Sequence, residues 1–325
     1  MSLLQKAVRR GRLELALQAA STLLEIAPDR FWRRAGVIAF EDIGVADLPT
    51  AGIVTVALEG KRFRQRLGGG WVVAAAITTR MAISPRNRAA DDLFCLLESW
   101  PGLADNRQRL ENLPIPRLRL IALTTEHLPL RALALRMIFS DRRLDLPRRG
   151  STDIGFDVLD ELGVAPTTFA VTREGYRRTG EMLAPLVALL TLENGLRDKM
   201  QDDPLPPETM IGPLPGWALD IFTREGRAAL AKIFQIDAGI RKWATDALPA
   251  AGRVEMLAQA LFRVESGMCL QRQDGPTGER LRELMERECM GLSPDQADEV
   301  LALMRGAIPL LNTARRNVLG GQSHA

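Results

Sequence analysis

The chain has 325 residues, of which 46% are hydrophobic, enough to form two domains or one large helical array. Charged residues make up 26%, and no run of about 18 apolar residues predicts a membrane span. Two histidines, His127 and His324, and three scattered cysteines without a CxxC pair do not favour disulfides or a zinc site. We therefore expect a cytoplasmic protein that needs no cofactor and does not contact a membrane.

The net charge of +3 is distributed unevenly along the chain. Residues 1–150 carry 24 Lys or Arg against 15 Asp or Glu, a balance of +9, whereas residues 151–325 carry 19 against 25, a balance of −6. A basic half favours an anionic partner such as DNA. Packing of the basic half against the acidic half by complementary charge explains the same numbers, and both interpretations stay open.

Apolar residues recur at helical spacing along almost the whole chain, and the alternation typical of strands is scarce. We predict an all-α fold, a multi-helix array. An opening pair of helices breaks near Gly11, and a third helix follows Pro28, with Asp29 as N-cap, and ends at Gly44.

Further helices are expected after the third one. They begin near Asp47 or Thr50, after the glycine run 68–70, and at Ser84 with Pro85 in the first helical position. Residues 101–150 are interpreted as a basic, more irregular connecting region. The helices expected beyond it cover Asp153–Leu162, Arg173–Arg197, Trp217–Phe234, Val254–Met268, Thr277–Cys289 and Pro294–Arg305, with a proline-rich loop at 201–216.

Glu41 and Asp42 stand at the predicted C-terminal end of the third helix, where the helix dipole disfavours negative charge. No basic residue of the same helix lies at the favourable spacing from either acid, since Arg34 is seven residues before Glu41. We therefore expect both carboxylates to be largely buried and bound by an arginine or a helix-start N–H group from another segment.

The stretch around these acids resembles a signature in the helical C-terminal region of clamp-loader-related AAA+ ATPases of the RarA/MgsA type. The matching residues are Arg33, Arg34, Ala39, Glu41, Asp42, Ile43, Gly44, Ala46 and Asp47. The segment "GRLELALQAASTLLE" before it and "AISPRNRAADDL" after it are similar to the neighbouring family elements. The resemblance covers about residues 3–95.

This resemblance implies a collar-like helical domain over residues 1–100 that mediates oligomer assembly in a protein acting at DNA forks or primer ends. The sequence contains no Walker A or Walker B motif, so ATP hydrolysis is not carried over. We divide the remainder into the connecting region 101–150 and an acidic helical domain of unknown role, residues 151–325.

The leading functional hypothesis is a non-enzymatic assembly or DNA-binding protein linked to DNA replication, recombination or repair. Basic residues that could contact phosphates form two clusters, and an aromatic side chain within the first could stack on a base. The candidates are Lys61, Arg62, Phe63, Arg64 and Arg66, then Arg142, Arg143, Arg148 and Arg149. A solvated helix face is the simpler interpretation of the first cluster.

Two alternatives stay open. One is a protein-only adaptor that docks a separate AAA+ ATPase, and assembly of the chain into a homo-oligomer is also left open. The other is a hydrolase or lyase, because acids occur as neighbours at Asp91–Asp92, Asp202–Asp203 and Glu41–Asp42. Adjacent residues on a helix point about 100° apart, and no nucleophile–base pair is recognisable, which disfavours catalysis.

Overall fold

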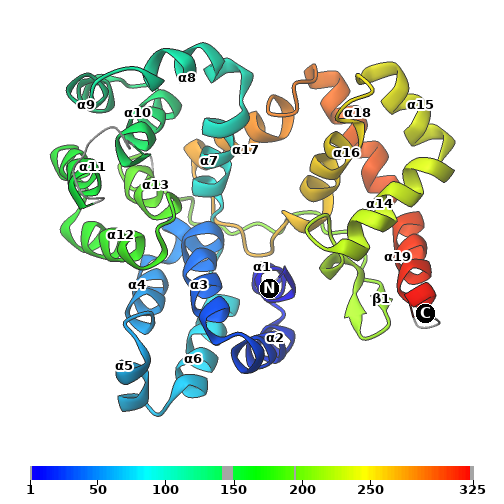
Figure 1. Ribbon diagram of the computed structural model, residues 1–325, viewed down its shortest axis with the longest axis horizontal. Helices are drawn as coiled ribbons and strands as arrows, with labels where there is room; N and C mark the ends of the chain where they lie inside the picture. Colours follow the sequence, from blue (N-terminus) through cyan, green and yellow to red (C-terminus); the bar gives the residue numbers. More distant parts are fainter. Residues whose placement is uncertain (1, 141–148, 194, 323–325) are drawn as a thin grey trace.

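The computed structural model describes residues 2–140, 149–193 and 195–322 and confirms the all-α fold class (Figure 1). Within these ranges the only strands are β1 (Met210–Ile211) and β2 (Leu214–Pro215), a short antiparallel pair. No helix in the described part of the chain is long and apolar enough to cross a membrane.

The helices gather around two separate apolar cores, which define a first and a second body. The first core takes most of its residues from positions 4–190. The elements of the first body are α1 (Ser2–Arg9), α2 (Leu13–Ile26), α3 (Pro28–Ile38), the π turn η1 (Ala39–Ile43), the 3₁₀ turn η2 (Gly44–Asp47), α4 (Leu48–Ala57), α5 (Lys61–Arg66), α6 (Gly70–Ile83), α7 (Ala89–Ser99), the 3₁₀ turn η3 (Pro101–Leu103), α8 (Ala104–Glu111), α9 (Ile115–Thr124), α10 (Leu128–Ser140), α11 (Arg149–Glu161), α12 (Pro166–Thr179) and α13 (Leu183–Leu190).

The expectation of irregular structure after residue 100 is wrong for residues 101–140, which form η3 and α8 to α10. Pro114 and Pro116 were the reason for expecting irregular structure here. In the structure they stand just before and just after the first residue of α9, where a missing N–H costs nothing. Leu118, Ala122 and most of α10 are buried in the first core, so burial stabilises these helices.

Two other predicted helix starts are also wrong. Asp29 lies in the first turn of α3 and does not cap it. Helix α7 begins at Ala89 rather than Ser84, because residues 84–88 run alongside a distant segment. The Arg86 N–H donates to the carbonyl of Gln271, and the Gln273 N–H donates back to the carbonyl of Arg86. A helix starting at Ser84 would lose this pairing.

The second body closes around residues 229–314. It contains α14 (Arg224–Ile236), α15 (Ala238–Ala247), α16 (Arg253–Leu261), the π turn η5 (Phe262–Ser266), α18 (Pro294–Gly306) and α19 (Ile308–Gln322). The 3₁₀ turn η4 (Gly216–Ala218) precedes it, and Trp217 and Ala218 are buried in the first core. The expected helix Arg173–Arg197 is interrupted, since α12 ends at Gly180 in the left-handed conformation. The expected helix from Trp217 begins only at Arg224.

The chain crosses between the bodies three times. The proline-rich segment 195–216 leads into the second body, residues 267–275 lead back, and α17 (Pro276–Arg287) then packs on α7 before α18 returns (Figure 1). The two extended segments pair with each other, because Gln201 and Arg272 exchange backbone hydrogen bonds of 2.8 and 2.7 Å. We call this region, together with the side chains of α1 and residues 84–88 that bind it, the junction.

Candidate functional site

The two acids of the signature lie in the π turn η1, which extends α3 (Figure 1). Gly44 ends the turn with a φ of +52°, a conformation that favours glycine. A β-carbon at Gly44 would lie 2.9 Å from the backbone oxygen of Asn87, so the residues after α6 pack closely against the turn. The signature glycine therefore serves both the backbone angle and this close approach.

Both carboxylates are bound by arginines from other elements, as predicted. Asp42 is fully buried and accepts hydrogen bonds from Arg9 Nε at 2.5 Å and Gln5 Nε2 at 2.8 Å, with Arg88 as a third donor. Glu41 accepts from Arg9 Nη2 at 2.5 Å and from Arg88 Nη1 at 3.4 Å. These contacts join α1, η1 and the start of α7 into one network.

The electrostatics of the network keep Asp42 charged. Burial alone would raise the pKa of Asp42, but Arg9 and Arg88 outweigh it and hold that pKa below its usual value. Burial and the adjacent Asp42 raise the pKa of Glu41. Burial would lower the pKa of Arg88, yet Asp91, Asp42 and Glu41 together raise it. The arrangement is an ion network in which Asp42 is bound through both oxygens, whereas Glu41 is bound through Oε1 and also lines the cavities described below.

The α1 side chains also connect the network to the second body. Arg9 donates to the Ser266 carbonyl at 2.9 Å, Arg10 to the Glu265 carbonyl at 2.7 Å, and Lys6 pairs with the buried Asp220. Burial lowers the pKa of Lys6 to about 8, although Asp220 opposes this shift. Part of the basic excess of the N-terminal half therefore does bind the acidic half, as one interpretation of the charge asymmetry expects.

The other signature residues have separate surroundings. Asp47 caps α4, accepting from the Thr50 N–H at 3.0 Å and from the Ser84 hydroxyl at 2.7 Å. Arg34 donates to Gln5 Oε1 at 3.0 Å, and Arg33 is exposed. The structure thus brings Glu41 and Asp42 together with each other, but not with Arg33 or Asp47.

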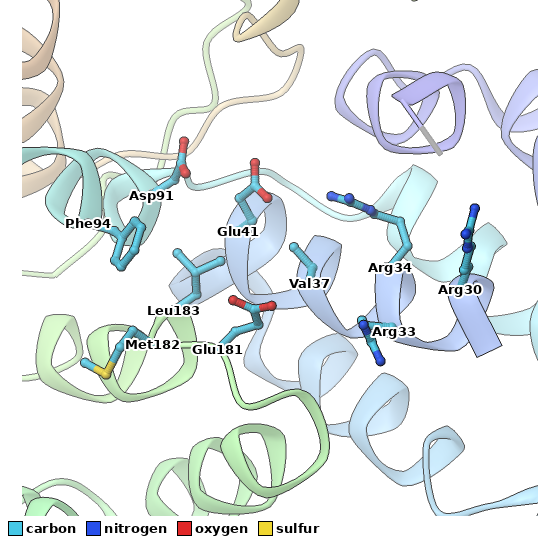
Figure 2. A pocket seen from close by; sticks show the side chains of 10 residues that line it. All are labelled: Arg30, Arg33, Arg34, Val37, Glu41, Asp91, Phe94, Glu181, Met182 and Leu183. Carbon is cyan, nitrogen blue, oxygen red and sulfur yellow. The ribbon is translucent and has the colours of Figure 1, made fainter. Parts of the chain in front are cut away.

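A half-open cavity of about 450 Å³ lies beside α3 (Figure 2). Arg30, Arg33 and Arg34 of α3 line it, and the apolar part of its wall includes Phe94. A larger cleft of about 620 Å³ shares Arg34, Glu41 and Asp91 with it and extends to Phe222 and Phe262 of the second body. The two openings meet at the edge of the ion network.

The predicted basic cluster forms the short helix α5, at the end of a projection made by α4, α5 and α6 (Figure 1). Lys61, Arg62 and Arg66 are exposed, and none forms an ion pair within the described ranges. Arg64 differs, because its guanidinium lies 4.0 Å from the Trp32 ring centre and donates to the Ala57 carbonyl at 3.0 Å. Phe63 is half-buried, with Arg66 5.7 Å from its ring centre.

The second basic cluster falls largely beyond what the structure describes. Arg142, Arg143 and Arg148 lie outside the described residues. Arg149 is the first residue of α11. The prediction of phosphate contacts from this cluster therefore stays a prediction.

Three of the neighbouring acids line a third cavity, of about 270 Å³. Asp92 is buried in its wall, and Asp202 and Asp203 line it as well. Asp203 binds Arg272 at 2.8 Å, and Asp202 accepts from the Gln271 N–H. Asp91 pairs with Arg88, and Glu41 and Asp42 share Arg9 and Arg88.

Two of the cysteines are poor candidates for reactive thiolates. Burial raises the pKa of the Cys95 thiol and raises that of Cys269 to about 12. His127 stacks on Trp100 with 6.3 Å between the ring centres. Among the described residues, no group of three or more His, Cys, Asp or Glu could hold a metal ion.

The sequence predicted an arginine or a helix-start N–H group from another segment, without identifying Arg9 or Arg88. These residues lie 33 and 46 positions from Asp42, a distance at which helical periodicity carries no information. One indication was present, since Arg88 belongs to the segment Ala82–Leu93 that resembles the family. The paired linkers and the buried Arg315–Glu265 contact gave no local signal.

With this geometry established, we compared the chain with known proteins. No protein-family model, no curated protein and no solved structure matches it. The resemblance to the collar region of clamp-loader-related ATPases therefore stays a prediction, based on the signature residues alone.

Proposed function

We propose that the chain is a non-enzymatic helical assembly protein that binds DNA and belongs to DNA replication, recombination or repair. The observation that carries this proposal is the exposure of Lys61, Arg62 and Arg66 on α5 without acidic partners among the described residues. Lys6, Arg9, Arg10, Arg86 and Arg88 are engaged in the junction. The three basic residues on α5 remain available for phosphate groups.

The surroundings of α5 suit a nucleic-acid backbone. The helix lies at the end of the projection, so a bulky polymer reaches it without meeting the rest of the first body (Figure 1). Trp71 is the second residue of α6 and is 45% exposed, while Phe63 is half-buried within α5. Aromatic faces beside basic side chains are typical of surfaces that bind single strands by stacking and charge.

The test replaces Lys61, Arg62 and Arg66 by Gln together. Arg64 is left intact, because its contacts with Trp32 and Ala57 are structural. We expect wild-type affinity for a fluorescent single-stranded or forked DNA to fall steeply with salt. In the variant the log–log slope should become shallower by about 0.7–0.9 for each lost phosphate contact.

A matched control removes the same charges from the second body. Arg224, Arg227 and Lys232 of α14 are exposed and form no ion pair with a described residue, so their replacement by Gln should leave the slope unchanged. If the salt slope becomes equally shallow in both variants, net charge alone attracts DNA. Failure of the wild type to bind any DNA form at near-physiological salt would refute the proposal.

The same projection supports a second candidate, a protein-only adaptor that docks a separate AAA+ ATPase or a further copy of the chain. Leu67, Trp71 and Val72 lie within six residues of each other and are each about half exposed, and Ile53 and Val56 of α4 are also exposed. Exposed apolar side chains gathered on one element are typical of protein interfaces.

The adaptor candidate has its own test. The Leu67→Ser/Val72→Ser variant should lose an AAA+ ATPase that co-purifies with the wild type from the native host. Ile236→Ser, at a similarly exposed position of the second body, should retain it. Retention of the ATPase by both variants would exclude this surface. Neither candidate expects ATP or GTP turnover by the purified chain, since the sequence has no phosphate-binding loop and no Walker B acid for Mg²⁺.

A further inference from the structure

The cavity beside α3 has a charge arrangement that the ion network does not explain. Arg30, Arg33 and Arg34 stand at spacing i, i+3 and i+4 on α3 and all line the cavity; Arg30 and Arg34 extend to one side of the helix and Arg33 to the other (Figure 2). None of them forms an ion pair with a described residue, and only Arg34 makes a side-chain hydrogen bond, to Gln5. This contrasts with Arg9 and Arg88, which each bind two or more carboxylates.

The acids in the cavity wall do not neutralise these arginines. Glu41 is engaged by Arg9 and Arg88, and Asp91 by Arg88. Glu181 is the one carboxylate of the wall that forms no ion pair within the described ranges. Three guanidinium groups against this single free carboxylate leave a local charge of about +2, which a phosphate monoester dianion would balance.

The remainder of the wall is apolar. Phe94, Met182 and Leu183 lie together at one end, Arg30 and Arg34 lie at the other, and Val37 stands between them (Figure 2). A ligand that fills the cavity would therefore have an anionic end and an apolar end. The volume of about 450 Å³ lies within the range typical of small-molecule sites and is too small for a folded partner.

We propose that this cavity binds a small phosphate monoester with an apolar or aromatic body, with the phosphate on Arg30, Arg33 and Arg34 and the body against Phe94, Met182 and Leu183. Guanidinium groups bind phosphate through two parallel N–H donors, and three that line one cavity can surround its oxygens. Val37 and Leu183 exclude water from the middle of the site. The site lies apart from α5 and goes beyond the proposed function.

The probe for this site is phenyl phosphate, which combines a dianion with one ring. Isothermal titration calorimetry on the full chain should detect the binding of phenyl phosphate. Inorganic phosphate should bind at least about tenfold more weakly, because it lacks the ring and its apolar burial. Benzoate, with one charge, should also bind at least about tenfold more weakly. Absence of phenyl phosphate binding at low ionic strength would overturn the proposal.

The variant Arg30→Gln/Arg33→Gln removes two exposed guanidinium groups that form no ion pair or hydrogen bond with a described residue, so it should fold normally. We expect phenyl phosphate to bind about tenfold or more weakly to it. Arg30→Lys/Arg33→Lys keeps the charge but loses the paired donors, so its affinity for phenyl phosphate should lie between those of the wild type and the Gln variant. The control Arg224→Gln/Arg227→Gln removes the same residues at the same spacing on α14 and should bind like the wild type. An equal loss in the control would overturn the proposal.

A second measurement locates the ring. With methyl-labelled methionine, the Met182 signal, assigned by its loss in Met182→Leu, should shift on addition of phenyl phosphate but not of inorganic phosphate. A shift confined to other methionines would place the ligand elsewhere and refute the site. Competition by an oligonucleotide that depends on Lys61, Arg62 and Arg66 would assign the anion effect to α5, and would likewise refute it.

Discussion

The junction and the projection contain the same residue types in opposite situations. At the junction, Arg9, Arg88 and Arg272 are buried and bound to carboxylates or backbone carbonyls. On the projection, Lys61, Arg62 and Arg66 are exposed and have no acidic partner among the described residues. The first set is scattered along the sequence and the second is a basic cluster in it, and only the second can bind an external anion without breaking the fold.

This difference shows what a charged cluster contributes in each place. Buried ions lose their hydration, and the loss is offset only when every donor and acceptor is matched, so the junction fixes how the two bodies meet. Exposed ions keep their hydration and contribute little to stability, so their role must lie in contacts with other molecules. The following predictions test this contrast, beginning with the largest expected effect.

Replacement of Asp42 by Ala should destabilise the chain strongly. The variant leaves Arg9 and Arg88 buried without their shared carboxylate, and removing one partner of a buried ion pair costs about 3–5 kcal/mol. The free energy of unfolding, measured by urea denaturation at pH 7, should fall by this amount. Asp153→Ala breaks an exposed pair with Arg173 and should cost less than about 1 kcal/mol. Equal losses of unfolding free energy in the two variants would contradict the difference drawn between buried and exposed ion pairs.

Asp92 should be the weak point of the junction at neutral and alkaline pH. It is 3% exposed, forms no ion pair or hydrogen bond through its carboxylate with a described residue, and burial raises its pKa to about 7 despite Arg272 and Arg88. The folded chain then binds more protons than the unfolded chain between about pH 4 and 7. Stability should fall as pH rises through this window, by up to about 4 kcal/mol from this group.

The asparagine of the Asp92→Asn variant cannot ionise, so this variant isolates the contribution of Asp92 to the pH dependence of stability. Near pH 4 the variant and the wild type should unfold at similar urea concentrations, and at pH 8 the variant should be the more stable. Asp153→Asn serves as the exposed control and should show no such crossover. A variant that is less stable than the wild type at pH 8 would show that charged Asp92 is stabilised by its neighbouring arginines.

The contrast also explains what could be predicted from the sequence. Local features were accessible: the all-α class, a cap at Asp47 or Thr50, and the need for an arginine or a helix-start N–H group from outside to bind Glu41 and Asp42. Contacts between distant segments were not, because nothing local to Ser84 indicates that residues 84–88 pair with Gln271 and its neighbours. Arg33 and Arg34 of the cavity belong to the signature and Arg30 does not, and the cavity around them is completed by the loop before α13, far along the chain.

Within the projection itself, Arg64 and Arg62 should behave differently although they are two residues apart. Arg64 covers the Trp32 ring and donates to the Ala57 carbonyl, which closes α5 onto α3 and α4. Arg64→Ala should therefore lower the free energy of unfolding by about 1–2 kcal/mol, the sum expected for a partly desolvated cation–π contact and one hydrogen bond.

Arg62→Ala should change stability by less than about 0.5 kcal/mol, as is usual for exposed positions. The order reverses for DNA, because Arg62 is free to contact a phosphate and Arg64 is held against the protein. Thermal unfolding and salt-dependent DNA titration of the two single variants thus give opposite rankings if α5 is divided between a structural and a binding face. If Arg62→Ala proves as destabilising as Arg64→Ala, all of α5 is structural. The hypothesis that the basic projection binds DNA would then be wrong.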